Sequence, residues 1–306
     1  MFDIVRRRYW YFGLSLLVIV PGVIALALWG LPLAIDYTGG TLLELQFPQV
    51  DLPLQPADIR AVYEAQGFPD SAVQTSGKDI AIIRSKALDE TQQQAIIAAL
   101  EARYGTHTLL NAATVGPSVG AEVTQSAALA VGMAALGILA YIWFAFRRLE
   151  HAWRYGICAI IAMLHDVLVV IGLAAILGRL LGWPVDSLFL TALLTVAGFS
   201  VHDTIVVFDR IRENLVIHRR LGYETVVNHS IVQTLDRSIN TQLTVMFTLL
   251  ALALFGGVTI RHFVVMLLIG VFSGTYSSIF NAAPLLVVWE NREWVNLFRR
   301  RNPATA

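Results

Sequence analysis

The stretch LLTVAGFSVHDTIVVFDRIREN, residues 193–214, decides how the whole chain is interpreted. It begins like the interior of a membrane span, yet Asp203 arrives while the apolar residues 205–208 are still to come. A carboxylate at the centre of a membrane helix costs about 2.5–3.5 kcal/mol even on mild insertion scales. An ionisable residue in such a place is a candidate for function, so the partner of Asp203 is the first thing to find.

The composition shows that most of the chain faces lipid. Of 306 residues, 56% are hydrophobic and 14% are charged, whereas a soluble domain carries about 25% charged residues. The formal net charge is zero, which argues against a nucleic-acid-binding protein with its basic excess. The single cysteine, Cys158, lies in an apolar run, where it packs and forms neither a disulfide nor a thiolate metal site.

Six apolar stretches are long enough to cross the hydrocarbon layer, which takes about 20 helical residues. The first follows Arg6–Arg8 but is too long for the apolar core of a signal peptide, so we interpret it as a retained anchor. The sequence therefore predicts a polytopic α-helical membrane protein with six transmembrane helices. These lie at approximately 11–31, 126–146, 157–177, 188–208, 241–260 and 263–286.

Arginines in the short loops predict the orientation. With the N-terminus inside, the short outer loops hold only Arg179 and Arg261. The cytoplasmic side then holds Arg6–Arg8, Arg147, Arg148, Arg154, the 209–240 loop and the basic tail 291–306. We therefore expect both termini in the cytoplasm, with the first helix within 1–33 and the other five within 125–290.

Residues 34–124 form the one large outer segment, and their pattern predicts an α+β domain. TLLELQF (41–47) alternates apolar and polar residues as a half-buried strand does. PADIRAVYEAQG (56–67) starts with a proline and ends at a glycine, which is typical of a helix. SAVQTS and DIAIIRS flank Gly77-Lys78 as a hairpin.

The rest of this segment predicts a second helix, capped by Asp89 and ended by Gly105, and a last strand in HTLLNAATVG (107–116). The order β-α-β-β-α-β is that of a ferredoxin-like domain. The segment contains no metal-ligand spacing, no nucleophile with a base and no phosphate-binding loop. We therefore expect a binding or mechanical module without a metal or cofactor.

The helix around Asp203 has a narrow polar face, because Ser200, Asp203, Thr204 and Val207 recur at helical spacing. Such a face must point to another helix or to water. The next span opens with LDRSINTQLT (235–244), and Arg237 in it stands near the same membrane boundary. The predicted geometry therefore allows an ion pair between Asp203 and Arg237.

A second carboxylate, Asp166, follows His165 near the middle of the third span. Asp166 either relays protons or satisfies a partner helix, and the sequence leaves both interpretations open. We expect His165 to be a structural hydrogen-bonding residue, since no second histidine or cysteine shares its face. In the last span, residues 276–281 bring hydroxyl and amide side chains together, which is typical of close helix packing.

Four motifs resemble the SecF members of the SecD/SecF family, within the resistance-nodulation-division superfamily. They are IDYTGGT (35–41) at the exit from the first span, GFSVHDTIVVFDRIREN (198–214), LDRSINTQLT (235–244) and GTYSSIFNAAPLL (274–286). The resemblance covers nearly the whole chain, and the fourth-span motif is long and specific. One difference is His202, where the family has Asn more often.

The resemblance implies a translocase subunit, not an enzyme, that uses the proton-motive force in the cytoplasmic (inner) membrane. It implies SecD as partner, with the SecYEG channel, the translocating preprotein and YajC as further partners. Proton coupling would fall to Asp203 and Arg237, with Asp166 as a weaker candidate. The motif residues Asp36, Gly39, Gly40, Thr41, Ser200, Thr204 and Asn240 would be structural.

Two other classes of protein stay open. One is half of a small-molecule or lipid exporter of the same superfamily, although one outer domain of about 90 residues disfavours this. The other is a passive translocase scaffold in which Asp203 only specifies packing. Proton flux would separate the scaffold from the other two, and crosslinking to exported chains would separate translocase from exporter.

Overall fold

The computed structural model describes residues 3–50, 52–147 and 151–293. They fall into two compact units. One is helical and contains residues up to 31, 131–183 and the chain from 188 onward; the other is an α+β unit of residues 32–130 and 184–187. We describe each unit by itself.

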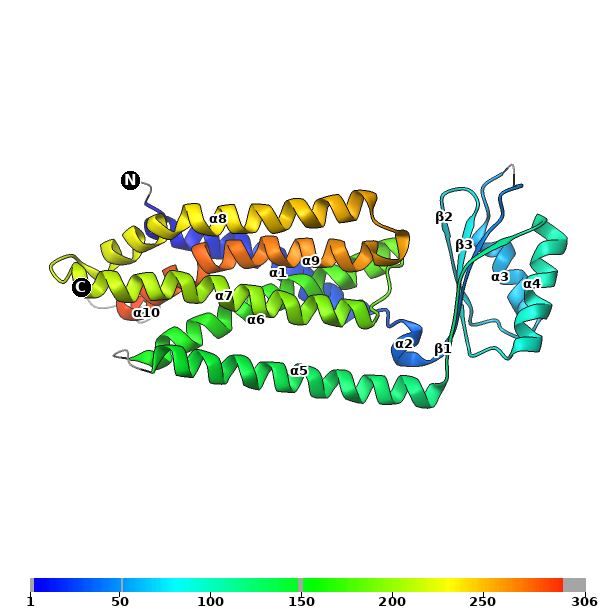
Figure 1. The fold of residues 1–306 in the computed structure, drawn as a ribbon, viewed down its shortest axis with the longest axis horizontal. Coiled ribbons are helices and arrows are strands. Elements are labelled where there is room, and N and C mark those ends of the chain that lie inside the picture. Colours follow the sequence, from blue (N-terminus) through cyan, green and yellow to red (C-terminus); the bar gives the residue numbers. More distant parts are fainter. Residues whose placement is uncertain (1–2, 51, 148–150, 294–306) are drawn as a thin grey trace, which may run out of the picture. The chain divides into compact units, whose positions relative to one another are not determined.

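Six helices in the described residues are long and apolar enough to span a membrane, as predicted. The first begins with a short 3₁₀ turn, η1 (Val5–Arg7), and the last is interrupted by a π-helical segment, η2 (Ser278–Ala282). Figure 1 shows these helices running alongside one another in a bundle. They are α1 (Arg8–Trp29), α5 (Pro117–Phe146), α6 (Ala152–Leu181), α7 (Ser187–Ile217), α8 (Tyr223–Phe255), and α9 (Val258–Ser277) with α10 (Ala283–Glu290).

Two of these helices extend well beyond their apolar stretches. α7 continues to Ile217 and α8 begins at Tyr223, so most of the predicted 209–240 loop is helical. At 1.5 Å per residue each helix is about 45–50 Å long, against a hydrocarbon thickness of about 30 Å. The extra turns hold the polar contacts Arg210–Gln233 and Asn214–Ser230 between the two helices.

The backbones of α1 and α6 approach closely at Gly22 and Gly172. A Cβ atom on Gly22 would lie 2.9 Å from the Cα of Gly172. Small residues allow such approaches, and in lipid the resulting van der Waals packing holds helices together.

The α+β unit has the predicted order of elements. After a short helix α2 (Ile35–Thr38), it contains β1 (Gly40–Gln46), α3 (Pro56–Ala65), β2 (Ala72–Ser76), β3 (Ile80–Ser85), α4 (Glu90–Tyr104) and β4 (Thr108–Val115). The sheet order is β2-β3-β1-β4 and all neighbours are antiparallel. α3 and α4 lie on one side of the sheet (Figure 1).

The local sequence signals described above explain how this unit is built. Leu43, Leu45 and Phe47 are fully buried, so the alternating strand turns its apolar side to the core. Asp89 makes a capping box with Gln92 at the start of α4. Gly77 has a φ of +65° in the β2–β3 hairpin, a conformation that glycine adopts without strain.

Candidate functional site

A layer of polar side chains is buried inside the apolar helical unit. In a membrane protein such residues face the bundle interior and take partners from other helices. The layer draws on every described span except α5. Its members are Ser15, Asp166, Ser200, Asp203, Thr204, Gln242, Ser273, Ser277, Ser278 and Asn281.

The polar face predicted around Asp203 is buried as expected. Asp203 is 5% exposed, and Ser200, Thr204 and Val207 are fully buried. The hydroxyl of Thr204 donates to the carbonyl of Ser200 one turn earlier, and it lies 3.0 Å from the Ser278 hydroxyl. This face of α7 therefore packs against the π-helical end of the last span.

The partner of Asp203 is Gln242 of α8, whose side-chain amide donates to Oδ2 of the carboxylate. The ion pair with Arg237 that the sequence left open is not formed. Arg237 stands five residues before Gln242, about 7.5 Å along the helix and on another face. It is exposed, and it lines a cavity of about 360 Å³ with Asp209 and Arg210.

Our sequence reasoning missed Gln242, although a signal was present. Thr234, Ser238 and Gln242 recur at every fourth position of α8, and all three are buried. That spacing puts them on one face of a helix. Gln242 also has a buried carbonyl oxygen, Oε1, for which the described residues offer no hydrogen-bond partner.

Asp166 is fully buried and takes its partners mainly from α9. The hydroxyl of Ser273 donates to Oδ1 over 2.7 Å and that of Ser277 donates to Oδ2 over 2.6 Å. Nδ1 of His165 lies 2.9 Å from Oδ1. Asp166 thus accepts hydrogen bonds from a partner helix, one of the two interpretations that the sequence left open.

One glycine of α9, Gly274, lies close to both the Asp166 carboxylate and the α7 backbone at Ser200. A Cβ atom on Gly274 would lie 3.5 Å from the Cα of Ser200 and 3.7 Å from Oδ2 of Asp166. The α9 backbone is therefore shared between the Asp166 region and the polar face of α7.

The π-helical segment η2 follows directly, and π-bulges are frequent at functional sites. Pro284 lacks a backbone N–H and cannot continue an α-helical ladder, which favours an irregular turn just before it. Within η2 the amide of Asn281 donates to the Ser15 hydroxyl of α1 over 2.8 Å. This segment links α9 to α1 as well as to α7.

The residues of the exit motif lie in the α+β unit and make close contacts there. Oδ2 of Asp36 accepts hydrogen bonds from the N–H and hydroxyl of Ser187, at 2.9 and 2.7 Å. A Cβ atom on Gly40 would run into the carbonyl oxygen of Ser85. The Thr41 hydroxyl accepts from the N–H of Leu88. These contacts hold the start of β1.

Two further predicted residues lie apart from the polar layer. Asn240 is exposed on α8, where its carbonyl accepts from Thr244. Gly39, with a φ of +71°, belongs to the exit motif. Among the residues that the structure describes, no group of three or more His, Cys, Asp or Glu side chains is placed to hold a metal ion.

Comparisons with known proteins agree with this architecture. Residues 94–292 match the family model described as protein export membrane protein SecD/SecF, C-terminal. The protein translocase subunit SecF of Anaerolinea thermophila is 53% identical over 309 aligned positions that cover 100% of both chains. The SecF of Thermobaculum terrenum is 51% identical and covers 100% of this chain and 99% of its own.

Solved structures are similar as well. The crystal structure of SecDF from Thermus thermophilus superposes with a TM-score of 0.84 at 33% identity, covering 95% of this chain and 39% of that longer chain. SecDF in its super-membrane-facing form gives 0.68 at 32% identity, over 98% and 40%. This chain, a multi-pass membrane protein and a transport component rather than an enzyme, therefore belongs to the SecF family of Sec protein-export subunits.

Proposed function

We propose that this protein works with SecD and uses the proton-motive force to promote translocation and release of preproteins on the outer side of the membrane. Some relatives are longer single chains named SecDF, and these support the pairing with SecD. The SecYEG channel and YajC are the further partners in this proposal. The arginine-rich loops support cytoplasmic termini.

The observation that carries the proposal is the buried Asp203 carboxylate with a neutral amide as its partner. An ionised carboxylate only accepts hydrogen bonds, whereas the protonated acid must donate one. The Gln242 amide serves the first state through Nε2. After half a turn of the amide, Oε1 would accept from the acid, and Oε1 has no other described partner. A proton at Asp203 would thereby reverse the direction of the hydrogen bond between α7 and α8.

The energy available is sufficient for such a switch. At a proton-motive force of about 150 mV, one proton supplies roughly 3.5 kcal/mol. A difference of that size shifts a two-state equilibrium by on the order of a hundredfold. One proton per cycle is therefore enough to bias a motion of the outer domain.

In this proposal Arg237 is not the ion-pair partner of Asp203 that the sequence allowed. It stands with Asp209, Arg210 and Glu213 around a polar cavity at the bundle end that holds the N-terminus. Water in this cavity would bring protons toward the α7–α8 contact, and Arg237 would control their entry by its positive charge. Asp166 is the second and weaker proton-coupling candidate.

The proposal is tested by replacing Asp203 with Asn, which keeps the size and polarity of the side chain but removes its titratable charge. Proton-dependent completion of export should collapse in inverted vesicles that also contain SecD, while ATP-driven initiation should persist. The measurement is protease protection of a preprotein with and without an uncoupler.

Asp236→Asn is the matched control, because Asp236 is an exposed carboxylate of α8 that does not line the polar cavity. It should leave the response to the uncoupler unchanged. If Asp203→Asn vesicles respond to the proton gradient like the wild type, the passive scaffold replaces the proposal.

A further inference from the structure

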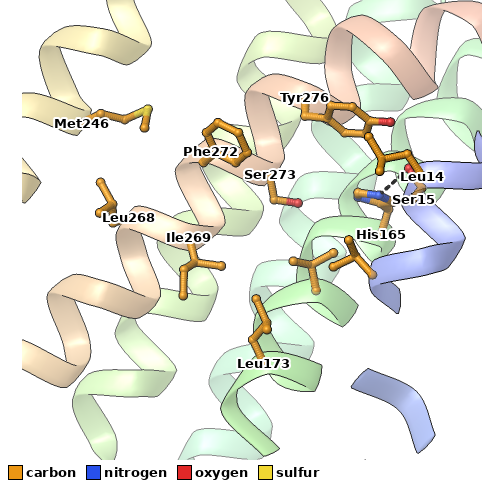
Figure 2. Close-up of a pocket in the computed structure, with 12 residues that line it drawn as sticks. Leu14, Ser15, His165, Leu173, Met246, Leu268, Ile269, Phe272, Ser273 and Tyr276 are labelled. Atoms are coloured by element: carbon orange, nitrogen blue, oxygen red, sulfur yellow. Dashed lines mark hydrogen bonds between the residues drawn. The ribbon is translucent and has the colours of Figure 1, made fainter. Parts of the chain in front are cut away.

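His165 is a buried titratable group that the mechanism above does not use. It extends from α6 between Asp166 and α1, and its side chain is 10% exposed. Nδ1 lies 2.9 Å from Oδ1 of Asp166, and Nε2 lies 3.0 Å from the hydroxyl of Ser15. Figure 2 shows the ring reaching Ser15 beside Tyr276.

The neighbours of the ring decide which nitrogen can change its protonation state. Asp166 already accepts hydrogen bonds from Ser273 and Ser277, so Nδ1 serves it best as a third donor. Nε2 faces a hydroxyl, which both donates and accepts. Nε2 therefore faces a suitable partner with or without a proton, whereas Nδ1 suits Asp166 only as a donor.

Ser15 can serve both states. When Nε2 is bare, the Ser15 hydroxyl donates to it and accepts from the Asn281 amide. When Nε2 carries a proton, Ser15 accepts from both and turns its own proton to a carbonyl one turn earlier, as helical serines do. Nε2 and the Ser15 hydroxyl therefore have partners in either state.

The other surroundings are poor in charge. The titratable groups that face the pair are Tyr276 of α9, whose ring stacks on His165 at 6.2 Å, and Asp203 of α7, within electrostatic reach of Asp166. α1 adds Tyr11, whose carbonyl accepts from Tyr276. A cavity of about 480 Å³ beside the ring is otherwise lined by apolar side chains, among them Met246 of α8 (Figure 2).

We infer that His165 is a second proton-binding site of this protein, with Asp166 as its counter-charge and Ser15 of α1 as the group that senses its charge. A proton that arrives at Nε2 converts the neutral imidazole into an imidazolium, which pairs with the Asp166 carboxylate. Its release returns Nε2 to the Ser15 hydroxyl, so one proton is bound and one is lost. α1 then leads from Trp29 into the outer domain.

This inference rests on the proposed function for its consequence in export, but proton binding can be measured separately. The full-length protein, labelled with ¹⁵N in its histidine rings, is placed in lipid nanodiscs. Its ring signals are recorded by NMR between about pH 5 and pH 9, around the ordinary titration range of histidine. His165→Gln identifies the His165 signals.

We expect Nε2 of His165 to gain a proton within this range while Nδ1 stays protonated throughout. In Asp166→Asn the midpoint should move by about one pH unit or more, a tenfold change in proton affinity, because the imidazolium loses its counter-charge. His202→Gln is the control, since His202 is exposed on α7, and it should leave the midpoint in place. An Nε2 signal that does not change, or a midpoint that Asp166→Asn leaves unmoved, would overturn the inference.

Export assays in vesicles with SecD give the second readout. His165→Gln should flatten the pH dependence of proton-driven export and leave ATP-driven initiation intact. A loss that is equal at every pH would indicate a purely structural role and would refute the inference. If His165 titrates together with Asp166 but wild-type export ignores the proton gradient, the second site stands and the proposed function fails. If export is proton-driven but His165 does not titrate, the proposed function stands and the second proton-binding site is refuted.

Discussion

The two units of this molecule bury opposite kinds of core. In the α+β unit the centre is apolar, built from side chains such as Leu45, Ile59 and Ile96. In the helical unit, apolar contacts surround a layer of carboxylates, hydroxyls and amides. In water, removing apolar surface from solvent drives folding. In lipid it gives no such gain, so close packing and polar contacts decide which helices meet.

The difference also shows in how each unit treats a buried hydroxyl. The Tyr63 hydroxyl of the α+β core has no hydrogen-bond partner among the described residues, and burial raises its pKa well above the ordinary value. The hydroxyls of Ser273 and Ser277 in the helical unit are each aimed at a carboxylate. In the helical unit a buried carboxylate thus orients the hydroxyls around it, whereas the Tyr63 hydroxyl has no such partner among the described residues.

The largest effect is expected in the apolar core. Leu45 is fully buried between the sheet and its helices, and Leu45→Ala should destabilise the isolated domain, residues 36–122, by about 2–5 kcal/mol. Urea unfolding followed by circular dichroism measures this. Leu52→Ala is the control, because Leu52 is 77% exposed. An isolated domain that is unfolded from the start would contradict an independent hydrophobic core.

An intermediate effect is expected where the helical unit depends on close packing. Gly22→Ala places a Cβ atom against the backbone of Gly172, which cannot move aside as a side chain can. We expect a loss of about 1–3 kcal/mol, measured by equilibrium unfolding in mixed micelles. Gly13→Ala on the same helix meets no atom within 4 Å and should cost nothing. Equal behaviour of the two variants would mean that the α1–α6 contact does not hold the unit together.

The smallest effect is expected at the polar end of the helical unit, where Arg8 pairs with Glu293 and Glu224. Burial opposes ionisation of Glu293, but hydrogen bonds from Arg8, Tyr9 and Asn291 more than offset it and hold its pKa below the ordinary 4.5. A lowered pKa in the folded state stabilises the protein above pH 4.5. That contribution is lost as the pH falls through the lowered value.

Arg8→Gln should therefore cost on the order of 1 kcal/mol at pH 7 and much less at a pH below the lowered pKa of Glu293, where this carboxyl is protonated in both proteins. Thermal melting at the two pH values measures the difference. A loss that is the same at both would assign the effect to packing of the long arginine side chain and not to its charge.

The sequence predicts those features that the solvent imposes. A helix must cross about 30 Å of hydrocarbon with its backbone satisfied internally, so the six spans follow from hydropathy alone. The period of two in TLLELQF and the cap at Asp89 are local signals, and the α+β unit follows them. The polar face of α7 is likewise a matter of spacing.

The pairing of polar faces does not follow from the sequence in the same way. Spacing shows that Asp203 faces a helix, but the rotation and height of α8 decide whether Arg237 or Gln242 meets it. These depend on contacts far apart in the chain, such as Asn214 with Ser230 and Ser278 with Thr204. For the same reason Ser15, 150 positions before His165, could not be named as its partner.

Ser277 and Ser278 are neighbours in the chain, yet the first donates to Asp166 and the second contacts Thr204, one residue from Asp203. Neighbouring helix positions point about 100° apart, so a rotation of the last span that strengthens one of these contacts would weaken the other. The regions around the two carboxylates would then compete for the orientation of this helix, like weights on the two arms of a balance.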